Sequence, residues 1–322
     1  MPATPSFQPR PYRGVPGGSV VRACRVHWQV TDHRAPQRTD PMPSHKQGRL
    51  LIIGGHEDKK HDRLILRVLA DHVGESGKLV VATVASQLPN EMWEEYETVF
   101  RSLGVHHVHK LAIERREEAK SAQKRKILDD ATAVFFTGGD QLRITSQLGD
   151  TPVYERLDEI YHAGGLIAGT SAGASVVCET MMVEGEGNDS HRIGTGLRMA
   201  PGLGFLKGVI VDQHFAERGR MGRLLGAVSQ NPRILGIGID ENTAILVTGQ
   251  RTFRVFGDGA VYVLDGSTVS YSNITEAQVE KTLSIYDVKL HVLTQGDTFD
   301  LSSRRPFAHP AKEVTRELVG AE

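Results

Sequence analysis

Short apolar segments alternate with segments of helical spacing between residues 49 and 168, and this alternation constrains the fold more than any other feature. The run Leu50-Leu51-Ile52-Ile53 ends at Gly54-Gly55 and is typical of a buried strand. Further strands are expected at 78–84, 106–113, 133–137 and 166–168, with helices at 63–72, 90–103 (with Asn90 as its N-cap) and 114–130. Strands that alternate with helices predict a parallel sheet covered on both faces, hence an α/β fold.

The pattern changes after about residue 234. Four apolar runs follow one another with turns and without a helix, at 236–239, 244–247, 253–256 and 261–264. They predict an antiparallel extension of the same sheet. We expect one domain over 48–296, a poorly ordered leader rich in Pro and Arg over 1–47, and a frayed C-terminal tail over 297–322.

Composition excludes several classes of protein. The chain has 38 Lys and Arg against 39 Asp and Glu, which argues against a nucleic-acid-binding protein. Its two cysteines exclude a disulfide scaffold and a cysteine-based zinc module, and no HExxH or other zinc spacing is present, so no metal or cofactor is expected. The sequence has no signal peptide and no apolar run of the roughly 20 residues that span a membrane, which predicts a cytoplasmic protein.

The segment Gly169-Thr170-Ser171-Ala172-Gly173 matches G-x-S-x-G. It lies directly after the strand at 166–168 and before a helix expected over 172–182. A sharp strand-to-helix turn of this kind exposes a nucleophilic serine hydroxyl, here that of Ser171. A tight turn of small residues without a catalytic role is the alternative.

A nucleophilic serine needs a base, and His214 lies where the strand Val209–Phe215 runs into polar residues. Ends of strands are where open α/β sheets place their sites. At the next strand end, Asp240 or Glu241 could orient the imidazole, and spacing alone leaves both open. The alternatives are a packed histidine and a solvated turn. The order serine, histidine, acid disfavours the α/β-hydrolase fold.

Backbone N–H groups near the serine could form an oxyanion hole, and the candidates are those of Ala172 and Gly139. Arg218, Arg220 and Arg223 follow His214 within ten residues, and guanidinium groups bind carboxylates bidentately. An ordinary glycine turn and a solvated charged helix start are the alternatives.

Four ordered motifs together resemble the cyanophycinase family of serine peptidases, which also includes the aspartyl dipeptidases. The motifs are FFTGGDQ (135–141), GTSAGAS (169–175), VDQHFAERGRMGRL (211–224) and GIGIDENTA (236–244). The resemblance extends over about 49–293 and includes IIGGHED (52–58) and SIYDVKLHVL (284–293). It implies a class I glutamine-amidotransferase-like three-layer sandwich. The DQHF-x-x-R-x-R-x-x-R pattern favours the cyanophycinase branch, whereas the leader departs from the compact members.

The resemblance also implies residue roles. Ser171 is similar to the nucleophile, His214 to the general base and Glu241 to the residue that orients it. The substrate pocket would include Gln141, Asp212, Gln213, Arg218, Arg220 and Arg223. The implied reaction is metal-free release of β-aspartyl-arginine from cyanophycin (multi-L-arginyl-poly-L-aspartate) by an exopeptidase that forms an acyl-enzyme, and the implied assembly is a homodimer. The alternatives are an aspartyl or isoaspartyl dipeptidase and a non-catalytic binding protein on the same sheet.

Overall fold

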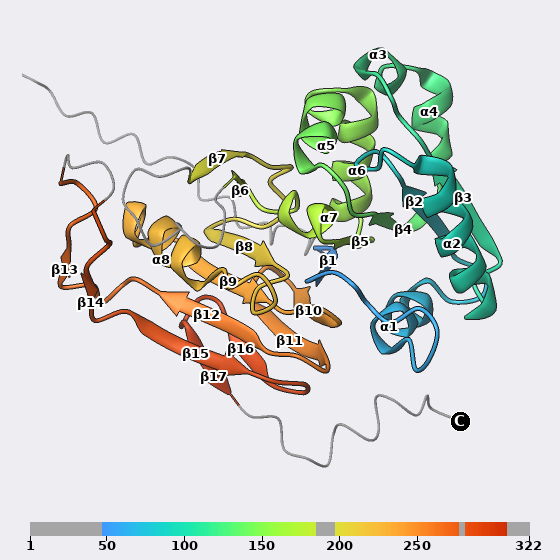
Figure 1. The fold of residues 1–322 in the computed structure, drawn as a ribbon. Helices are drawn as coiled ribbons and strands as arrows, with labels where there is room; N and C mark the ends of the chain where they lie inside the picture. Colours follow the sequence, from blue (N-terminus) through green and yellow to red (C-terminus); the bar gives the residue numbers. More distant parts are fainter. Residues whose placement is uncertain (1–46, 185–196, 277–280, 308–322) are drawn as a thin grey trace, which may run out of the picture. The chain divides into compact units, whose positions relative to one another are not determined.

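The computed structural model describes residues 47–184, 197–276 and 281–307. Its central feature is a nine-stranded sheet in the order β17-β16-β11-β10-β1-β5-β4-β2-β3 (Figure 1). The parallel part consists of β1 (Arg49–Ile53), β2 (Lys78–Ala82), β3 (His107–Leu111), β4 (Ala131–Phe136) and β5 (Leu166–Thr170). The antiparallel part consists of β10 (Thr243–Thr248), β11 (Thr252–Gly257), β16 (Thr298–Asp300) and β17 (Arg305–Phe307). The predicted parallel sheet with an antiparallel extension is therefore confirmed.

Helices cover both faces of this sheet, because side chains along a strand point alternately to opposite faces. From β1, Leu51 and Ile53 pack with α1 (Leu64–Val73) and α2 (Pro89–Ser102). Leu50 and Ile52 belong to the core on the opposite face. That face carries α3 (Arg116–Ala119), α4 (Ala122–Ile127), α5 (Gln141–Leu148), α6 (Pro152–His162) and α7 (Ala172–Ser175). The predicted three-layer arrangement is thus confirmed.

A second sheet has the order β15-β12-β9-β8 and comprises β8 (Val209–Gln213), β9 (Leu235–Ile239), β12 (Val261–Asp265) and β15 (Lys289–Leu293). The expectation that residues 236–239 and 261–264 extend the first sheet is wrong. Helix α8 (Met221–Gln230) connects β8 to its parallel neighbour β9. A Cβ on Gly236 would lie 2.9 Å from Val228 of α8, and one on Gly238 would lie 2.5 Å from the Phe215 ring. These two glycines therefore let α8 and Phe215 pack directly on β9.

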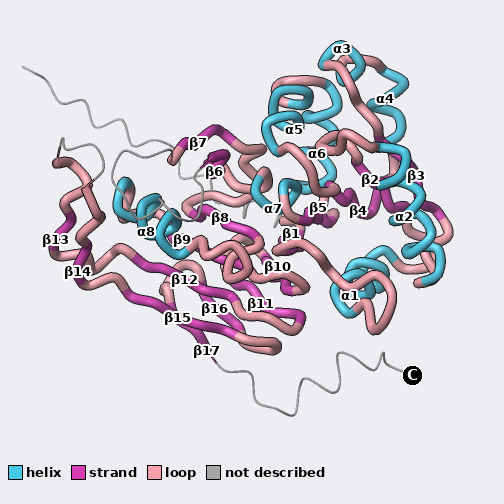
Figure 2. The backbone as a smooth tube through the Cα atoms, viewed as in Figure 1, coloured by secondary structure: helices cyan, strands magenta, loops and turns pink. Residues whose placement is uncertain are grey.

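Two short strand pairs complete the described elements. They are β6 (Thr180–Glu184) with β7 (Arg198–Pro201) and β13 (Tyr271–Ser272) with β14 (Ile285–Tyr286). Figure 2 shows that, in the described part of the chain, elements after α8 are strands. No helix among the described residues is long and apolar enough to cross a membrane.

All four predicted helices differ in their bounds, and α1 is shifted by one residue from the expected 63–72. Helix α2 begins at Pro89 with Leu88 as its N-cap, so Asn90 is not the cap; proline suits the first helical position because it lacks an N–H. The segment 114–130 forms α3 and α4 instead of one helix. The helix expected over 172–182 ends at Ser175, because Leu203 and Leu206 N–H groups take the carbonyls of residues 176 and 177.

The boundary expected at residue 296 also differs from the structure. Strand β16 pairs with β11, and β17 pairs with β16, so residues 298–307 belong to the sheet and not to a tail. The Phe299 ring is fully buried and stacks on Phe253 with 5.4 Å between ring centroids. Burial of this apolar ring stabilises β16 in the sheet. The leader up to residue 46 and the segment 308–322 lie outside the described residues.

Replacing Phe299 by alanine is expected to lower the free energy of unfolding by about 3–5 kcal/mol, because it leaves a cavity beside Phe253. Phe307→Ala is the matched control, since that ring is 46% exposed on β17, and it should change stability by about 1 kcal/mol or less. Chemical denaturation of both variants measures the difference. Equal losses would show that β16 does not anchor the end of the sheet.

Candidate active site

Ser171 lies at the turn between β5 and α7 with φ 53° and ψ −111°, a conformation that non-glycine residues rarely adopt. The turn is tight because its glycines allow close backbone contacts. A Cβ on Gly169 would lie 2.2 Å from the Gly173 carbonyl oxygen, and one on Gly173 would lie 2.4 Å from that of Phe136. The G-x-S-x-G segment thus forms the predicted sharp strand-to-helix turn.

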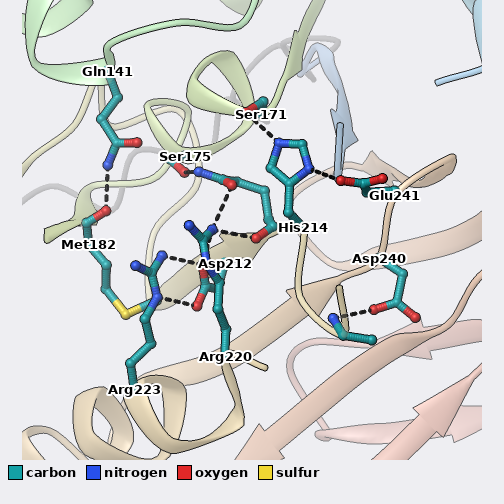
Figure 3. Close-up of polar contacts among 12 residues, drawn as sticks. Gln141, Ser171, Ser175, Met182, Asp212, His214, Arg220, Arg223, Asp240 and Glu241 are labelled. Carbon is teal, nitrogen blue, oxygen red and sulfur yellow. Dashed lines mark hydrogen bonds and ion pairs between the residues drawn. The ribbon is translucent and has the colours of Figure 1, made fainter. Parts of the chain in front are cut away.

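His214 and Glu241 complete a hydrogen-bonded relay with Ser171 (Figure 3). The Ser171 hydroxyl oxygen lies 2.9 Å from His214 Nε2, and His214 Nδ1 lies 2.6 Å from Glu241 Oε1. His214 follows β8 and Glu241 follows β9, so two neighbouring parallel strands deliver the imidazole and the carboxylate. When His214 Nδ1–H donates to Glu241, Nε2 is left free to accept the serine proton.

Asp240, the other candidate acid, has a different position. Its carboxylate accepts hydrogen bonds from the backbone N–H groups of Ala216 (2.9 Å) and Ala260 (3.0 Å). It therefore ties the loop after β8 to the turn before β12. Of the two acids that the sequence left open, the structure places Glu241 beside His214.

The end of β1 holds the loops that carry this relay. The carbonyl oxygens of residues 53, 54 and 55 accept, in that order, hydrogen bonds from the backbone N–H groups of Ser171 (3.0 Å), His214 (2.9 Å) and Asn242 (2.8 Å). Gly55 has φ 111°, and a Cβ there would lie 2.3 Å from His214 Cε1. Glycine is required here because the imidazole lies directly over the backbone.

The surroundings of His214 keep its imidazole neutral. Burial lowers its pKa below the ordinary 6.5, and the electrostatic effects of Arg218 and His56 act in the same direction, whereas the hydrogen bond to Glu241 opposes the shift. Burial would raise the pKa of Glu241, but hydrogen bonds from His56 and His214 outweigh it and lower the pKa. A neutral imidazole held by an ionised carboxylate is the state that can accept a proton from serine.

Of the two expected oxyanion-hole residues, Ala172 directly follows the serine and Gly139 lies in the loop after β4. Ala172 is the first residue of α7, where an N–H group has no partner within the helix. The backbone of Gly138 approaches Ser171 closely, since a Cβ on Gly138 would lie 3.5 Å from the Ser171 Cβ. Gly139 follows with φ 139°, and a Cβ there would lie 2.2 Å from the Ala85 carbonyl oxygen. The loop after β4 thus presents glycine backbone next to the serine.

A buried charge cluster adjoins His214 in sequence and in space. Asp212 is fully buried, and its carboxylate accepts hydrogen bonds from Arg223 Nε (2.6 Å) and Arg220 Nη1 (3.2 Å). Arg220 Nη1 also donates to Gln213 Oε1 (2.7 Å), and Gln213 Nε2 donates to Ser175 Oγ (3.4 Å). Burial lowers the pKa of Arg220 to about 10, against the opposing effect of Asp212, so the guanidinium stays charged at neutral pH.

The remaining predicted pocket residues are Gln141 and Arg218. Gln141 begins α5 and its side-chain amide donates to the Met182 carbonyl oxygen. Figure 3 shows Gln141, Arg220 and Arg223 to one side of the Ser171–His214 pair, with Glu241 on the other. Arg218 is exposed, and its backbone N–H donates to the His214 carbonyl oxygen at 3.1 Å. Of the three arginines, it offers the most accessible guanidinium.

Two residues to which the sequence analysis gave no role also contact the site. His56 Nδ1 lies 2.7 Å from Glu241 Oε2, the oxygen not used by His214. Glu57 is buried and accepts hydrogen bonds from the Tyr96 hydroxyl and from Thr170 Oγ1, directly before Ser171. Both follow Gly54-Gly55 at the end of a buried strand. That position, shared with His214 and Glu241, is the signal that could have revealed them.

Comparison with known proteins shows the family of this chain. The sequence model of peptidase family S51 matches residues 50–255. The chain belongs to peptidase family S51. It is 36% identical to a curated protein named cyanophycinase from Synechococcus elongatus, over 85% of this chain and 87% of that protein. It is 38% identical to another from Trichormus variabilis, over 84% of this chain and 89% of that protein.

A solved structure shares the fold. It is a peptidase from an acI-B1 Actinobacterium, with a TM-score of 0.60 and 23% identity over 80% of this chain and 98% of that one. Family membership and the named relatives identify the chain as a peptidase, hence a hydrolase. The resemblance that the four motifs indicated is confirmed.

Gly55→Ala is expected to displace the His214 ring and to slow the reaction of Ser171 with a fluorophosphonate about a hundredfold, because small misplacements of reacting groups have effects of that size. Gly74→Ala is the matched control: Gly74 also has a positive φ, 69°, but a Cβ there meets nothing within 4 Å. Both variants should lose stability through their positive φ, Gly55→Ala more because of its clash with the ring, and only Gly55→Ala should lose reactivity. Equal reactivity in the two variants would contradict the role of this close contact.

Proposed function

We propose that this S51 peptidase is a cyanophycinase, a serine-type exopeptidase that releases β-aspartyl-arginine from cyanophycin through a Ser171–His214–Glu241 triad. The observation that carries the proposal is the relay itself, with 2.9 Å from Ser171 Oγ to His214 Nε2 and 2.6 Å from His214 Nδ1 to Glu241 Oε1. It occurs in a chain whose curated relatives at 36–38% identity are named cyanophycinase.

In the proposed reaction, Ser171 Oγ attacks a carbonyl carbon of the polyaspartate backbone while its proton passes to His214 Nε2. The carbonyl π-electrons move to oxygen, and the N–H groups of Gly139 and Ala172 stabilise the oxyanion. When the carbonyl re-forms, the C–N bond breaks and His214 gives its proton to the leaving amine. Water then attacks the acyl-enzyme with His214 as base again, and Ser171 leaves with the proton. No step of this reaction requires a metal ion or a redox partner.

Recognition of the substrate would depend on charge. Each arginine of the polymer has a free carboxylate, which a guanidinium binds well. We assign the first such contact to Arg218, because it is exposed and close enough to lower the pKa of His214. Arg220 and Arg223 each pair with Asp212, so we propose that these three residues shape the pocket wall together with Gln141 and Gln213. Cytoplasmic location and a homodimer remain expectations.

Wild-type protein incubated with insoluble cyanophycin is expected to release β-aspartyl-arginine, identified by mass. Ser171→Ala should reduce the rate at least about a thousandfold, as loss of a triad serine does elsewhere. Retention of activity in Ser171→Ala would contradict the assigned nucleophile. Hydrolysis of small aspartyl dipeptides without clearing of the polymer would instead support the dipeptidase alternative.

The pH dependence of the reaction tests the role of His214 as the general base. Since His214 must be neutral to accept the serine proton, kcat/KM for a neutral activated ester should fall as the pH decreases through the His214 pKa, which lies below 6.5.

Arg218→Gln removes a positive charge that disfavours the imidazolium. The pKa of His214 should therefore rise, and the acidic limb of the pH profile should move to higher pH. The same variant should lose about 10–100-fold on cyanophycin, the value of a hydrogen bond between charged groups.

Arg115→Gln is the control, because that side chain is 80% exposed and pairs with Glu118 on the distant α3. It should change neither the acidic limb nor cleavage of the polymer. Equal losses of Arg218→Gln on ester and polymer would argue against carboxylate recognition by this residue. If the acidic limb of the pH profile does not move in Arg218→Gln, a group other than His214 controls it.

A further inference from the structure

His56, His214 and Glu241 form a cluster in which one ligand atom of each lies within 4.8 Å of the others. His56 Nδ1 is 2.7 Å from Glu241 Oε2, and His214 Nδ1 is 2.6 Å from Glu241 Oε1. The two imidazole rings meet edge to face with 5.0 Å between their centroids. Two imidazole nitrogens thus face one carboxylate from two sides. Nitrogen ligands with one carboxylate are the donor set that Zn²⁺ and its neighbours in the first transition row prefer.

We propose that these three residues bind a divalent transition-metal ion, such as Zn²⁺, which reversibly inactivates the serine relay. The effect on reactivity rests on the proposed function, whereas the binding itself does not. The site can be reached from solvent, because the side chains of His56 and Glu241 are 73% and 26% exposed. His214 is only 4% exposed, so an ion would approach its Nδ1 through the other two ligands.

The backbone presents His56 to this site. His56 has φ 47°, in the left-handed region, directly after Gly54-Gly55. The segment that holds the loops of His214 and Asn242 therefore also directs a second imidazole at Glu241. Zinc binds nitrogen at about 2.0–2.1 Å, so an ion here would replace both hydrogen bonds to Glu241, and each neutral imidazole would keep its proton on Nε2. The exposed side chain of His56 could turn to bring its Nδ1 within reach of the ion.

Metal binding would stop the relay through the tautomer of His214. In the hydrogen-bonded relay, Nδ1 has the proton and Nε2 is the acceptor for Ser171. A neutral imidazole that uses the Nδ1 lone pair for a metal must carry its proton on Nε2. The proton count of the ring is unchanged, but Nε2–H then faces Ser171 as a donor and cannot accept the serine proton. Removing the metal restores the original tautomer.

The test uses metal-stripped full-length protein and Zn²⁺ alone. Isothermal titration counts bound ions, and the rate of Ser171 labelling by a fluorophosphonate measures the relay without any peptide substrate. His56→Asn is the decisive variant, because asparagine tolerates positive φ and can still donate to Glu241 but lacks the imidazole ligand. His61→Ala is the matched control, an exposed histidine of the same loop that is outside the cluster. Each variant is compared with its own metal-free rate.

We expect Zn²⁺ to slow labelling of wild type and His61→Ala alike, a chelator to reverse this, and Mg²⁺ to have no effect. His56→Asn should bind one ion fewer and need at least about tenfold more Zn²⁺ for half inhibition. The proposal is overturned if His56→Asn keeps both the ion and the sensitivity, if wild type binds no ion at His56, or if binding leaves labelling unchanged. Cyanophycin cleavage is measured separately, so failure of the substrate assignment and failure of the metal site give different results.

Discussion

The site depends on three consecutive carbonyl oxygens at the end of β1. Residues 53, 54 and 55 accept hydrogen bonds from Ser171, His214 and Asn242, which belong to three loops far apart in the sequence. β1 lies between β5 and β10 in the sheet, and its residues 50–53 are fully buried, so the anchor is part of the close-packed core. Only glycine at position 55 allows this backbone to pass directly beneath the His214 ring.

Four of the ten non-glycine residues with positive φ in the described part of the chain lie around this anchor. His56, Ser171, His214 and Asn242 all have φ between 47° and 53°, and each contacts the relay or adjoins it in sequence. Non-glycine residues hold such conformations only where the surrounding structure determines them. Here the hydrogen bonds to residues 53–55 and the buried strands on both sides supply that constraint. In a regular strand, successive side chains point to opposite faces. The strained turns instead direct these side chains toward one another.

Much of this architecture could be predicted from sequence, because it depends on local patterns. Apolar runs gave the parallel strands, and the G-x-S-x-G glycines gave the turn at Ser171. Pairings that depend on distant segments could not be predicted: β9 belongs to the second sheet, where α8 packs on Gly236, and β16 joins the first sheet with Phe299 stacked on Phe253. Asp240 and Glu241 could not be told apart by spacing, since only the tertiary structure shows that Asp240 caps Ala216 and Ala260 while Glu241 contacts His214.

Charged side chains beside the relay affect both the pocket and the pKa of His214. Asp212 is fully buried and pairs with both Arg220 and Arg223. A buried ion pair adds little to stability compared with well-packed apolar residues, which makes a role in the site a better reason for its presence. Arg218 adds a further positive charge at the surface and lowers the pKa of His214. In the proposed function, the same charge of Arg218 would bind a substrate carboxylate, so recognition of the substrate and neutrality of the base would both depend on it.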